Sequence, residues 1–520
     1  MNTTEFLSIA TSICPERVAI VFEDKRYTFS QLNDRANRLA NALSKLGINK
    51  GDRVAILQVN CNQHLETYFA TAKLGAIYTP LNFRAKGEEL TYLLNSSEAN
   101  TLLVGQRYID LIKLIRPELT SVKNFISIEN KEDSMLSYED MILSPAQEVV
   151  TDIDDDDPTI LTYTAGTTGQ PKGVILSHNS FASYVLEYVT PADPDMEERN
   201  ILAVPLYHVA GIQAMLAAVY GGRTLIMERQ FDPVEWMKLV ETEKANRAMM
   251  VPTMLKQLID HPDFGKYDLS SIKIITYGAA PTSLEIIKKV MEAFPGVSLI
   301  NAFGQTETAA TITTLNPEDH VVTGTKEERE KKLRRLSSIG KPLSDVEMKI
   351  VDKQGNELPP EQVGEIVARG PMVMTGYWGD QEKTGKTIDR DGWLHTGDMG
   401  YRDEDGYFFL AGRTTDMIIR GGENICPEEV EAVLHSHPKI EEAAVIGVPN
   451  EEWGEQPIAI VVLKPKETST PEEIIEYCQN KLASCKRPSA VIFVDKLPHN
   501  SMGKVPKQVL RKKYGKAQVY

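Results

Sequence analysis

A short loop rich in glycine and threonine is the first feature of the sequence whose residue types could do chemistry. Residues 164–172 read TAGTTGQPK, and an apolar run follows directly. Glycine lets consecutive backbone N–H groups turn toward one ligand, threonine hydroxyls add donors, and the ammonium of Lys172 adds a positive charge. A plain hairpin turn would need only one glycine and one proline. The loop therefore indicates a site for phosphate oxygens.

The spacing of this loop differs from that of a Walker A loop, G-x-x-x-x-G-K-[ST]. A second segment, GDQEKTGKT at residues 379–387, comes close to that spacing. Its first glycine, Gly379, nevertheless stands one residue too early, and no hydrophobic strand leads into it. We therefore interpret the likeness of residues 379–387 to a Walker A loop as coincidental and expect a surface loop there.

Four later segments, taken together with the phosphate loop, resemble motifs of the adenylate-forming superfamily. They are NAFGQTE at 301–307, HTGD at 395–398, GRTTDMIIRGGENICPEEVE at 412–431 and NSMGKVPK at 500–507. Their order and spacing are similar to those of the family over nearly the whole chain. The family includes acyl-CoA synthetases, firefly-type luciferases and the adenylation domains of peptide synthetases. One departure is Ala165, where the family usually has serine, and it removes one hydroxyl donor.

The resemblance implies a site for ATP and Mg²⁺. Phe303 would stack on adenine, and Asp398 with Arg413 would bind the ribose hydroxyls. Thr306 would donate to the α-phosphate, and Glu307 would ligate the Mg²⁺ that bridges phosphate oxygens. Without the resemblance, we would interpret Phe303 as a core residue and the carboxylates of Glu307 and Asp398 as solvent-exposed side chains. The implied ligands of ATP or AMP are Thr164, Ala165, Gly166, Thr167, Thr168, Gly169, Lys172, Gly278, Ala279, Ala280, Asn301, Ala302, Phe303, Gly304, Thr306, Asp398, Arg413 and Lys504.

The resemblance also implies a reaction in two steps. A carboxylate attacks the α-phosphorus of ATP, pyrophosphate leaves, and the thiol of CoA then displaces AMP from the acyl-adenylate. Because the first step joins two anions, cations and fixed donors must surround that phosphorus. The expected catalytic residues are Lys504, Lys172, Thr306, Glu307 and His208. Gly421 and Gly422 would let the pantetheine arm of CoA pass close to the backbone.

The segment VPLYHVAG at 204–211 narrows the class of acid. Amino-acid-activating relatives usually carry an aspartate here, whereas this chain has Tyr207 and His208, and the histidine resembles the acyl-site residue of fatty and aromatic acyl-CoA synthetases. No carrier-protein serine motif follows, so CoA is the expected thiol. We expect a hydrophobic acid, first a medium- or long-chain fatty acid. Benzoate-like or alicyclic acids are the alternative, and an adenylate-forming oxygenase or a non-catalytic nucleotide-binding protein are more distant ones.

The composition of the chain limits the kinds of partner and the cellular compartment that we expect. The net charge of -16 argues against nucleic acid or an anionic membrane as a bulk partner. The five cysteines are scattered and lack a C-x-x-C pair, which suits a reducing compartment. Residues 1–20 lack a signal-peptide core, and no run of 18 apolar residues occurs. We expect a cytoplasmic protein with small-molecule partners, and the sequence leaves a homodimer open.

The elements that must position these residues belong to the α/β class. Helix-like and strand-like segments alternate up to about residue 340, which is typical of layered α/β structure with mostly parallel sheets. Short strands with Gly and Asp turns then predict a small β-barrel or meander. We expect a large N-terminal domain of several subdomains at 1–414 and a small, mobile α+β C-terminal domain at 415–520. Ser30 should cap a helix that Gly47 ends, Asp232 should cap another, and residues 324–338 should be exposed and mobile.

Overall fold

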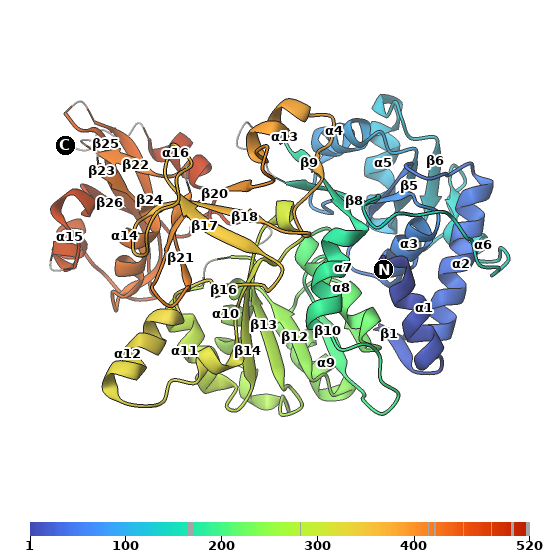
Figure 1. Cartoon of the computed structure of the whole chain (residues 1–520), viewed down its shortest axis with the longest axis horizontal. Helices are drawn as coiled ribbons and strands as arrows, with labels where there is room; N and C mark the ends of the chain where they lie inside the picture. Colours follow the sequence, from blue (N-terminus) through green and yellow to red (C-terminus); the bar gives the residue numbers. More distant parts are fainter. Residues whose placement is uncertain are drawn as a thin grey trace.

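The computed structural model of the chain describes residues 1–164, 170–280, 282–413, 415–420, 423–450, 452–479, 481–500 and 504–515. Seven of the expected site residues lie outside this part of the chain: Ala165, Gly166, Thr167, Thr168, Gly169, Gly421 and Gly422. The described residues form a mixed α/β structure built on four sheets, with the C-terminal elements gathered at one end (Figure 1). The predicted fold class is therefore confirmed.

An eight-stranded sheet carries the expected phosphate loop near one edge. Its strands, in spatial order, are β19 (Gly376–Tyr377), β9 (Lys172–Ser177), β8 (Pro158–Thr164), β4 (Ile77–Pro80), β3 (Arg53–Leu57), β5 (Thr101–Val104), β6 (Asn124–Ser127) and β7 (Leu136–Ser137). The chain of this region also forms helices α2 (Phe29–Lys45), α3 (Asn62–Lys73), α4 (Gly87–Ser97), α5 (Ile109–Ile115) and α6 (Tyr138–Met141). Strands β4, β3, β5, β6 and β7 pair in parallel, whereas β8 and β9 form an antiparallel pair.

A nine-stranded sheet forms the second layer. Its strands, in spatial order, are β16 (Lys341–Pro342), β15 (Thr313–Leu315), β14 (Ser298–Phe303), β13 (Ile274–Gly278), β12 (Arg247–Met250), β10 (Arg199–Leu202), β11 (Thr224–Met227), β1 (Val18–Phe22) and β2 (Lys25–Thr28). The strands from β14 to β1 are parallel, so their carboxyl ends lie at the same edge. The associated helices are α1 (Thr4–Ile13), α7 (His178–Tyr188), α8 (Val209–Tyr220), α9 (Pro233–Glu243), α10 (Pro252–Ile259) and α11 (Leu284–Ala293). One apolar core, with Trp236 and Phe181 fully buried in it, joins both large sheets.

A four-stranded antiparallel sheet stands where the sequence predicts a small barrel or meander. It comprises β17 (Glu347–Val351), β18 (Gly364–Arg369), β20 (Leu394–Arg402) and β21 (Phe408–Arg413). Two helices lie in this part of the chain, α12 (Lys326–Arg335) and α13 (Gln381–Thr387). Short 3-10 turns occur along the chain at Gln106–Tyr108, Arg116–Glu118, Phe264–Lys266, Thr306–Thr308 (η4), Pro317–His320 and Ser484–Lys486.

The C-terminal elements have apolar cores of their own. They are β22 (Ile418–Arg420), β23 (Glu423–Ile425), α14 (Pro427–His435), β24 (Ile440–Asn450), β25 (Gly454–Leu463), α15 (Pro471–Gln479), β26 (Ala490–Phe493) and α16 (Lys507–Tyr514). One face of the sheet packs around Val430 and Ile474, and the other packs around Ile446 and Leu510. Cores on both faces suit an α+β unit of this size. The boundary between residues 414 and 415 stays a prediction.

Of the two predicted helix N-caps, one is confirmed and one was wrong. Asp232 caps α9 as expected, because its carboxylate accepts the N–H groups of Val234 and Glu235. The prediction for Ser30 was wrong: Thr28 caps α2, in a reciprocal pair with Gln31. Both residues precede the same apolar stripe, and only the position of the first helical turn distinguishes them.

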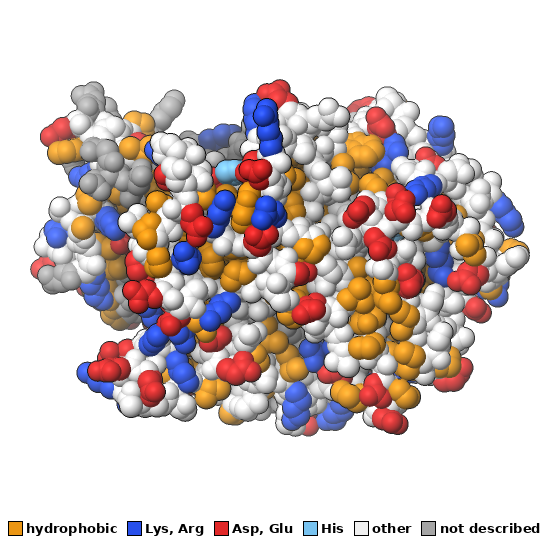
Figure 2. Space-filling view, viewed as in Figure 1, with side chains coloured by type: hydrophobic (Ala, Val, Ile, Leu, Met, Phe, Trp, Pro, Cys, Tyr) orange, Lys and Arg blue, Asp and Glu red, His pale blue; other side chains and the backbone are white. Residues whose placement is uncertain are grey.

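Two polar segments are helical, and for one of them, residues 379–387, the expected surface loop was wrong. Residues 379–387 contain α13, which Asp380 caps by accepting the N–H of Lys383. Residues 324–338 contain α12, whose side chains are exposed as expected. Figure 2 shows acidic and basic side chains mixed over α12, at the lower left of that view. Within the part of the chain that the structure describes, every helix is too short or too polar to cross a membrane.

Candidate active site

The expected phosphate loop joins two antiparallel strands at the edge region of the eight-stranded sheet. Thr164, the last residue of β8, pairs with Lys172, the first residue of β9, so the loop leaves and re-enters the sheet at one level. The Tyr92 hydroxyl donates a hydrogen bond of 3.0 Å to the carbonyl of Pro171. This contact fixes the end of the loop just before Lys172. The loop residues 165–169 themselves lie outside the described part of the chain.

Lys172 and Glu307 come together although 135 sequence positions separate them, because β9 contacts η4. The Tyr377 hydroxyl donates to Glu307 Oε1 at 2.9 Å, and the Lys172 ammonium lies 5.3 Å from the centre of the Tyr377 ring. The pKa of Lys172 is lowered to about 8, chiefly by burial and then by the nearby Lys383 ammonium, whereas Glu307 opposes the shift. The cluster thus combines an ammonium and a carboxylate beside the loop.

The segment NAFGQTE occupies the carboxyl end of β14 and the turn after it. Asn301 is buried, and its amide N–H donates to the Tyr277 carbonyl at 3.4 Å. Phe303 is half-buried and packs against both the main core and the small core under the four-stranded sheet. Thr306 opens η4. Stacking of Phe303 on adenine and hydrogen bonding of Asn301 to its edge remain predictions.

Backbone strain marks the same edge of the nine-stranded sheet. Ala279, Ala309 and Ala310 have φ angles of +63°, +47° and +94°, which L-residues adopt at a cost of about 1–3 kcal/mol. Ala279 and Ala280 follow the carboxyl end of β13, next to β14. Such strain is concentrated at functional sites. Ala279 lies on the first segment that was expected to line the nucleotide, and Ala309 and Ala310 follow shortly after the second, which ends at Glu307.

Gly278 is required by this geometry. It pairs with Ala302 across β13 and β14, and a Cβ at Gly278 would overlap the Ala302 carbonyl oxygen. We predict that Gly278→Ala lowers the free energy of unfolding by about 1–3 kcal/mol, as overpacking does, and weakens ATP binding. Thermal denaturation with and without ATP measures both effects. Gly265→Ala is the matched control, because a Cβ there meets no atom within 4 Å. Equal stability of the two variants would contradict the prediction.

Asp398 and Arg413 face each other across β20 and β21. Their side chains form an ion pair of 2.6 Å, in which the Asp398 carboxylate is 9% exposed and the Arg413 side chain 43%. Burial raises the pKa of Asp398, and the cations Arg413 and Lys504 oppose this rise. The Asp398 N–H also donates to the Thr396 hydroxyl at 3.0 Å. The two paired strands thus hold the ion pair in place, and its Arg413 side chain is accessible to solvent.

Lys504 reaches this site from the C-terminal elements. Desolvation is the main cause that lowers the pKa of Lys504; Arg413 also lowers it, whereas Asp398 and Glu307 oppose the shift. The residue as a whole nevertheless keeps exposed surface. The Lys504 N–H donates to Asn500 Oδ1 at 2.9 Å, and the Asn500 N–H donates to the Lys504 carbonyl at 2.9 Å. The ammonium therefore stands among the charges that the N-terminal sheets supply.

The attachment of the Lys504 segment depends on residues that the sequence analysis did not single out. The buried ammonium of Lys507 pairs with Glu428 at 2.8 Å and with Glu431 at 3.0 Å, both on α14. Arg511 pairs with Asp416 at 2.7 Å, just beyond β21. Lys256 of α10, in the N-terminal part of the chain, pairs with Glu441 of β24 at 2.5 Å. These contacts hold the C-terminal elements in the arrangement that presents Lys504.

His208 stands at the start of α8, as its N-cap residue. The pKa of His208 is lowered to about 3, chiefly by burial and to a smaller extent by the cations Arg84 and Lys504. The imidazole is therefore neutral at physiological pH. Asn60 shapes the segment that leads to it: its amide donates to the Val204 carbonyl at 3.1 Å and accepts the Leu206 N–H at 2.9 Å.

Four regions of the fold thus converge on one place. The electrostatic partners of Lys504 include His208 from the nine-stranded sheet, Asp398 from the four-stranded sheet, and Glu307. Glu307 in turn interacts with Lys172 of the eight-stranded sheet. The described residues expected to bind nucleotide beside them are Thr164, Gly278, Ala279, Ala280, Asn301, Ala302, Phe303, Gly304, Thr306 and Arg413. A polyanion and a neutral apolar group could meet there.

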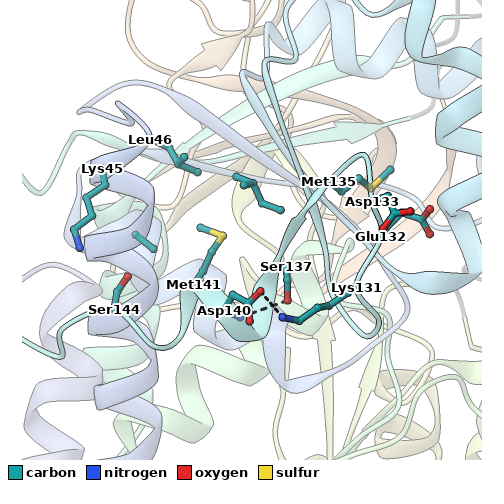
Figure 3. Close-up of a pocket in the computed structure, with 12 residues that line it drawn as sticks. Lys45, Leu46, Lys131, Glu132, Asp133, Met135, Ser137, Asp140, Met141 and Ser144 are labelled. Atoms are coloured by element: carbon teal, nitrogen blue, oxygen red, sulfur yellow. Dashed lines mark hydrogen bonds and ion pairs between the residues drawn. The ribbon is translucent and has the colours of Figure 1, made fainter.

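A separate hollow of about 490 Å³ lies at the far edge of the eight-stranded sheet, near α2, α6 and β7 (Figure 3). Lys131 and Asp140 form an ion pair of 2.8 Å at its wall. Its other lining residues come from 42–46 and 132–144. None of the expected site residues lines it, and β9 and β7 stand near opposite edges of the sheet. The hollow is therefore distinct from the candidate active site.

Comparison with known proteins gives consistent matches over nearly the whole length. The family of AMP-binding enzymes matches residues 10–378, and the AMP-binding enzyme C-terminal domain matches residues 429–504. The chain is 33% identical to a long-chain-fatty-acid–CoA ligase of Mycobacterium tuberculosis over 494 residues, 94% of each chain. It is 32% identical to an indoleacetate–CoA ligase of Aromatoleum aromaticum over 514 residues, 98% of each chain. The crystal structure of an anthranilate CoA ligase with anthranoyl-AMP is similar at a TM-score of 0.89 and 28% identity, covering 99% of this chain and 97% of that one.

Proposed function

Because the chain belongs to the AMP-binding enzyme family and is an ATP-dependent, AMP-forming carboxylate–CoA ligase, we propose that its acid is hydrophobic, first a medium- or long-chain fatty acid. ATP and CoA are its other substrates. The observation that carries the proposal is the convergence of Lys504, Asp398 and Glu307 beside a neutral His208 at the start of an apolar helix. A site of this kind can bring an acid of low polarity to an activated phosphate.

In the first step the carboxylate attacks the α-phosphorus of ATP. Lys504 draws the two anions together from one side, and Thr306 donates to the α-phosphate from the other. Lys172 and the residues 164–169 bind the β- and γ-phosphates, which leave as pyrophosphate. Asp398 accepts from the ribose hydroxyls, while Arg413 donates to them. Preorganised cations and donors of this kind stabilise charge as it develops at phosphorus.

Mg²⁺ fits the donor set near the phosphate loop. Glu307 supplies a carboxylate in the neighbourhood of Lys172, and Mg²⁺ prefers one or two carboxylates together with phosphate oxygens. When bound there, Mg²⁺ would be held by Glu307 and would offset the negative charge of the phosphates. The Tyr377 hydroxyl orients Glu307 by donating to its Oε1 at 2.9 Å.

The second step needs another arrangement of the C-terminal elements. We assign residues 415–520 to a mobile domain whose hinge lies at Thr415, next to the pairing of Asp416 with Arg511. Once the acyl-adenylate exists, Lys504 leaves the site, and the segment with Gly421 and Gly422 takes its place beside the pantetheine arm. Hinge residues commonly lie at element ends of this kind.

The environment of His208 supports a hydrophobic acyl group. A neutral imidazole can hydrogen-bond a carboxylate without trapping it in an ion pair. Helix α8, which follows, is buried at Val209, Ile212, Met215 and Leu216. An apolar wall favours apolar substrates by about 0.8 kcal/mol for each methylene that it buries. The similarity to an anthranilate CoA ligase and to an indoleacetate–CoA ligase favours aryl acids as the second candidate class.

Exchange of pyrophosphate into ATP, measured with a panel of acids, tests the proposed substrate class. The panel comprises acetate, octanoate, decanoate, palmitate, benzoate, indoleacetate and cyclohexanecarboxylate. Decanoate should exceed acetate in kcat/KM by at least about 100-fold, because each buried methylene contributes about 0.8 kcal/mol. The aryl acids turning over faster than all fatty acids would replace the first candidate class by the second. Acetate as the best substrate would contradict both.

A further inference from the structure

Lys383 belongs to residues 379–387, the segment whose spacing excludes a Walker A loop, and it lies next to Lys172 at the end of the expected phosphate loop. Its ammonium is 5.8 Å from the centre of the Tyr377 ring, and that of Lys172 is 5.3 Å from the same ring. Lys383 also interacts directly with Lys172, whose ammonium it disfavours. Two lysines that are 211 positions apart in sequence therefore share one small region.

The fold itself brings these two lysines together. Strand β19 adds to the edge of the eight-stranded sheet by pairing with β9, and α13 follows directly. The backbone N–H of Tyr377 donates to the Thr384 hydroxyl at 2.9 Å, which ties the first turn of α13 to β19. Because Lys172 begins β9, the pairing sets α13 beside the phosphate loop. The position of Lys383 is thus a property of the sheet edge and the cap at Asp380.

Neighbouring ammonium groups repel each other unless an anion lies between them. Within the described part of the chain, neither Lys172 nor Lys383 forms an ion pair with a carboxylate, although Glu307 and Asp380 act on Lys172 from farther away. By contrast, Lys386 on the same helix pairs with Glu382 at 2.5 Å. Uncompensated cations beside a glycine-rich loop form a site for a polyanion.

We propose that Lys383 is a second cation of the phosphate site and binds the β- and γ-phosphates of ATP, and the pyrophosphate formed from them, beside Lys172. The proposal rests on the assignment of Lys172 to these phosphates under the proposed function. Lys383 then assists acyl-adenylate formation and its reversal by pyrophosphate. It has no role in thioester formation, in which only AMP leaves.

The direct test measures the KM for inorganic pyrophosphate in the reversal of acyl-adenylate formation. Lys383→Met should raise this KM, and that for ATP, about tenfold, because a charge-assisted hydrogen bond to phosphate is lost and the half-exposed position of Lys383 limits its strength. Lys383→Arg should retain most of the affinity. Lys386→Met, on the same helix, is the matched control and should leave both KM values unchanged. Thioester formation from supplied acyl-adenylate and CoA should be unaffected in all three variants.

A pH profile tests the electrostatic coupling between Lys383 and Lys172 on which the proposal rests. The kcat/KM for ATP reports ionisations of the free enzyme. Lys172, with its pKa lowered to about 8, is protonated below that pH, so the wild-type profile should fall above about pH 8. Lys383→Met removes the neighbouring charge, the pKa of Lys172 rises, and the fall should move to higher pH. A fall at the same pH in the wild type and in Lys383→Met would show that the two ammonium groups are not coupled and would contradict the proposal.

Two outcomes distinguish failure of this proposal from failure of the site assignment. An unchanged KM for pyrophosphate in Lys383→Met, together with a large increase in Lys172→Met, would overturn the role of Lys383 alone. An unchanged KM in both variants would overturn the assignment of Lys172 as well. Equal losses in adenylate formation and thioester formation by Lys383→Met would also count against the proposal.

Discussion

Replacing Lys504 by alanine should reduce acyl-adenylate formation by about 10²–10³-fold, the effect usual for removing one preorganised donor at a developing charge. Lys504 stands among Arg413, Asp398 and Glu307, and its ammonium is partly desolvated. Electrostatic interactions are strong in such surroundings, because little water screens them. The contact contributes most while negative charge gathers at phosphorus.

The same variant should form the thioester nearly normally from supplied acyl-adenylate and CoA. In the proposed mechanism Lys504 has left the site by that step. Single-turnover measurements of the two half-reactions provide the comparison. Lys512→Ala is the matched control, because Lys512 is an exposed lysine on α16 of the same C-terminal elements. Loss of both half-reactions together would contradict the two arrangements of the C-terminal domain.

Replacing Asp398 by alanine should lower kcat/KM for ATP by about 10²-fold, and it should impair both half-reactions. The carboxylate would lose its hydrogen bonds to the ribose hydroxyls, each contributing about 1.5–3 kcal/mol in a charged pair. Its removal also leaves Arg413 without the partner at 2.6 Å that positions the guanidinium. Because AMP stays bound until the thiol displaces it, the second step should suffer as well.

Asp398→Asn separates charge from shape at this position. The amide retains one acceptor oxygen but lacks the charge that pairs with Arg413, so kcat/KM for ATP should fall between the wild type and Asp398→Ala. Asp405→Asn, in the turn between β20 and β21, serves as the control, because its partners are Lys331 and Arg335 of α12. If Asp398→Ala changed thermal stability but left the KM for ATP unaltered, its assignment to the ribose would be wrong.

The sequence predicted the fold class and the cluster around Lys504 because each motif lies on a strand end or turn with its own local pattern. Asp232 followed by proline, for example, is sufficient to place a helix start. The ligand-binding and catalytic roles of all the expected site residues stay predictions, and residues 165–169, Gly421 and Gly422 also fall outside the described residues.

The relation between Lys383 and Lys172 could not be predicted from local patterns. It depends on the pairing of Gly376 with Ile175 and of Tyr377 with Val174, contacts between segments about 200 positions apart. Motif spacing correctly rejected a Walker A loop at 379–387, but the rejection carried no information on where the segment packs. Asn60 was missed for the same reason: its contacts with Val204 and Leu206 join two different sheets.

The central claim is that the chain joins an acid to CoA through an acyl-adenylate. Product analysis with ATP, decanoate and CoA tests it most directly, supported by exchange of labelled pyrophosphate into ATP without CoA. The account predicts AMP and pyrophosphate in equal amounts with the acyl-CoA, and exchange that requires the acid and is lost in Lys504→Ala. Formation of ADP and phosphate, or exchange that proceeds without any acid, would contradict it.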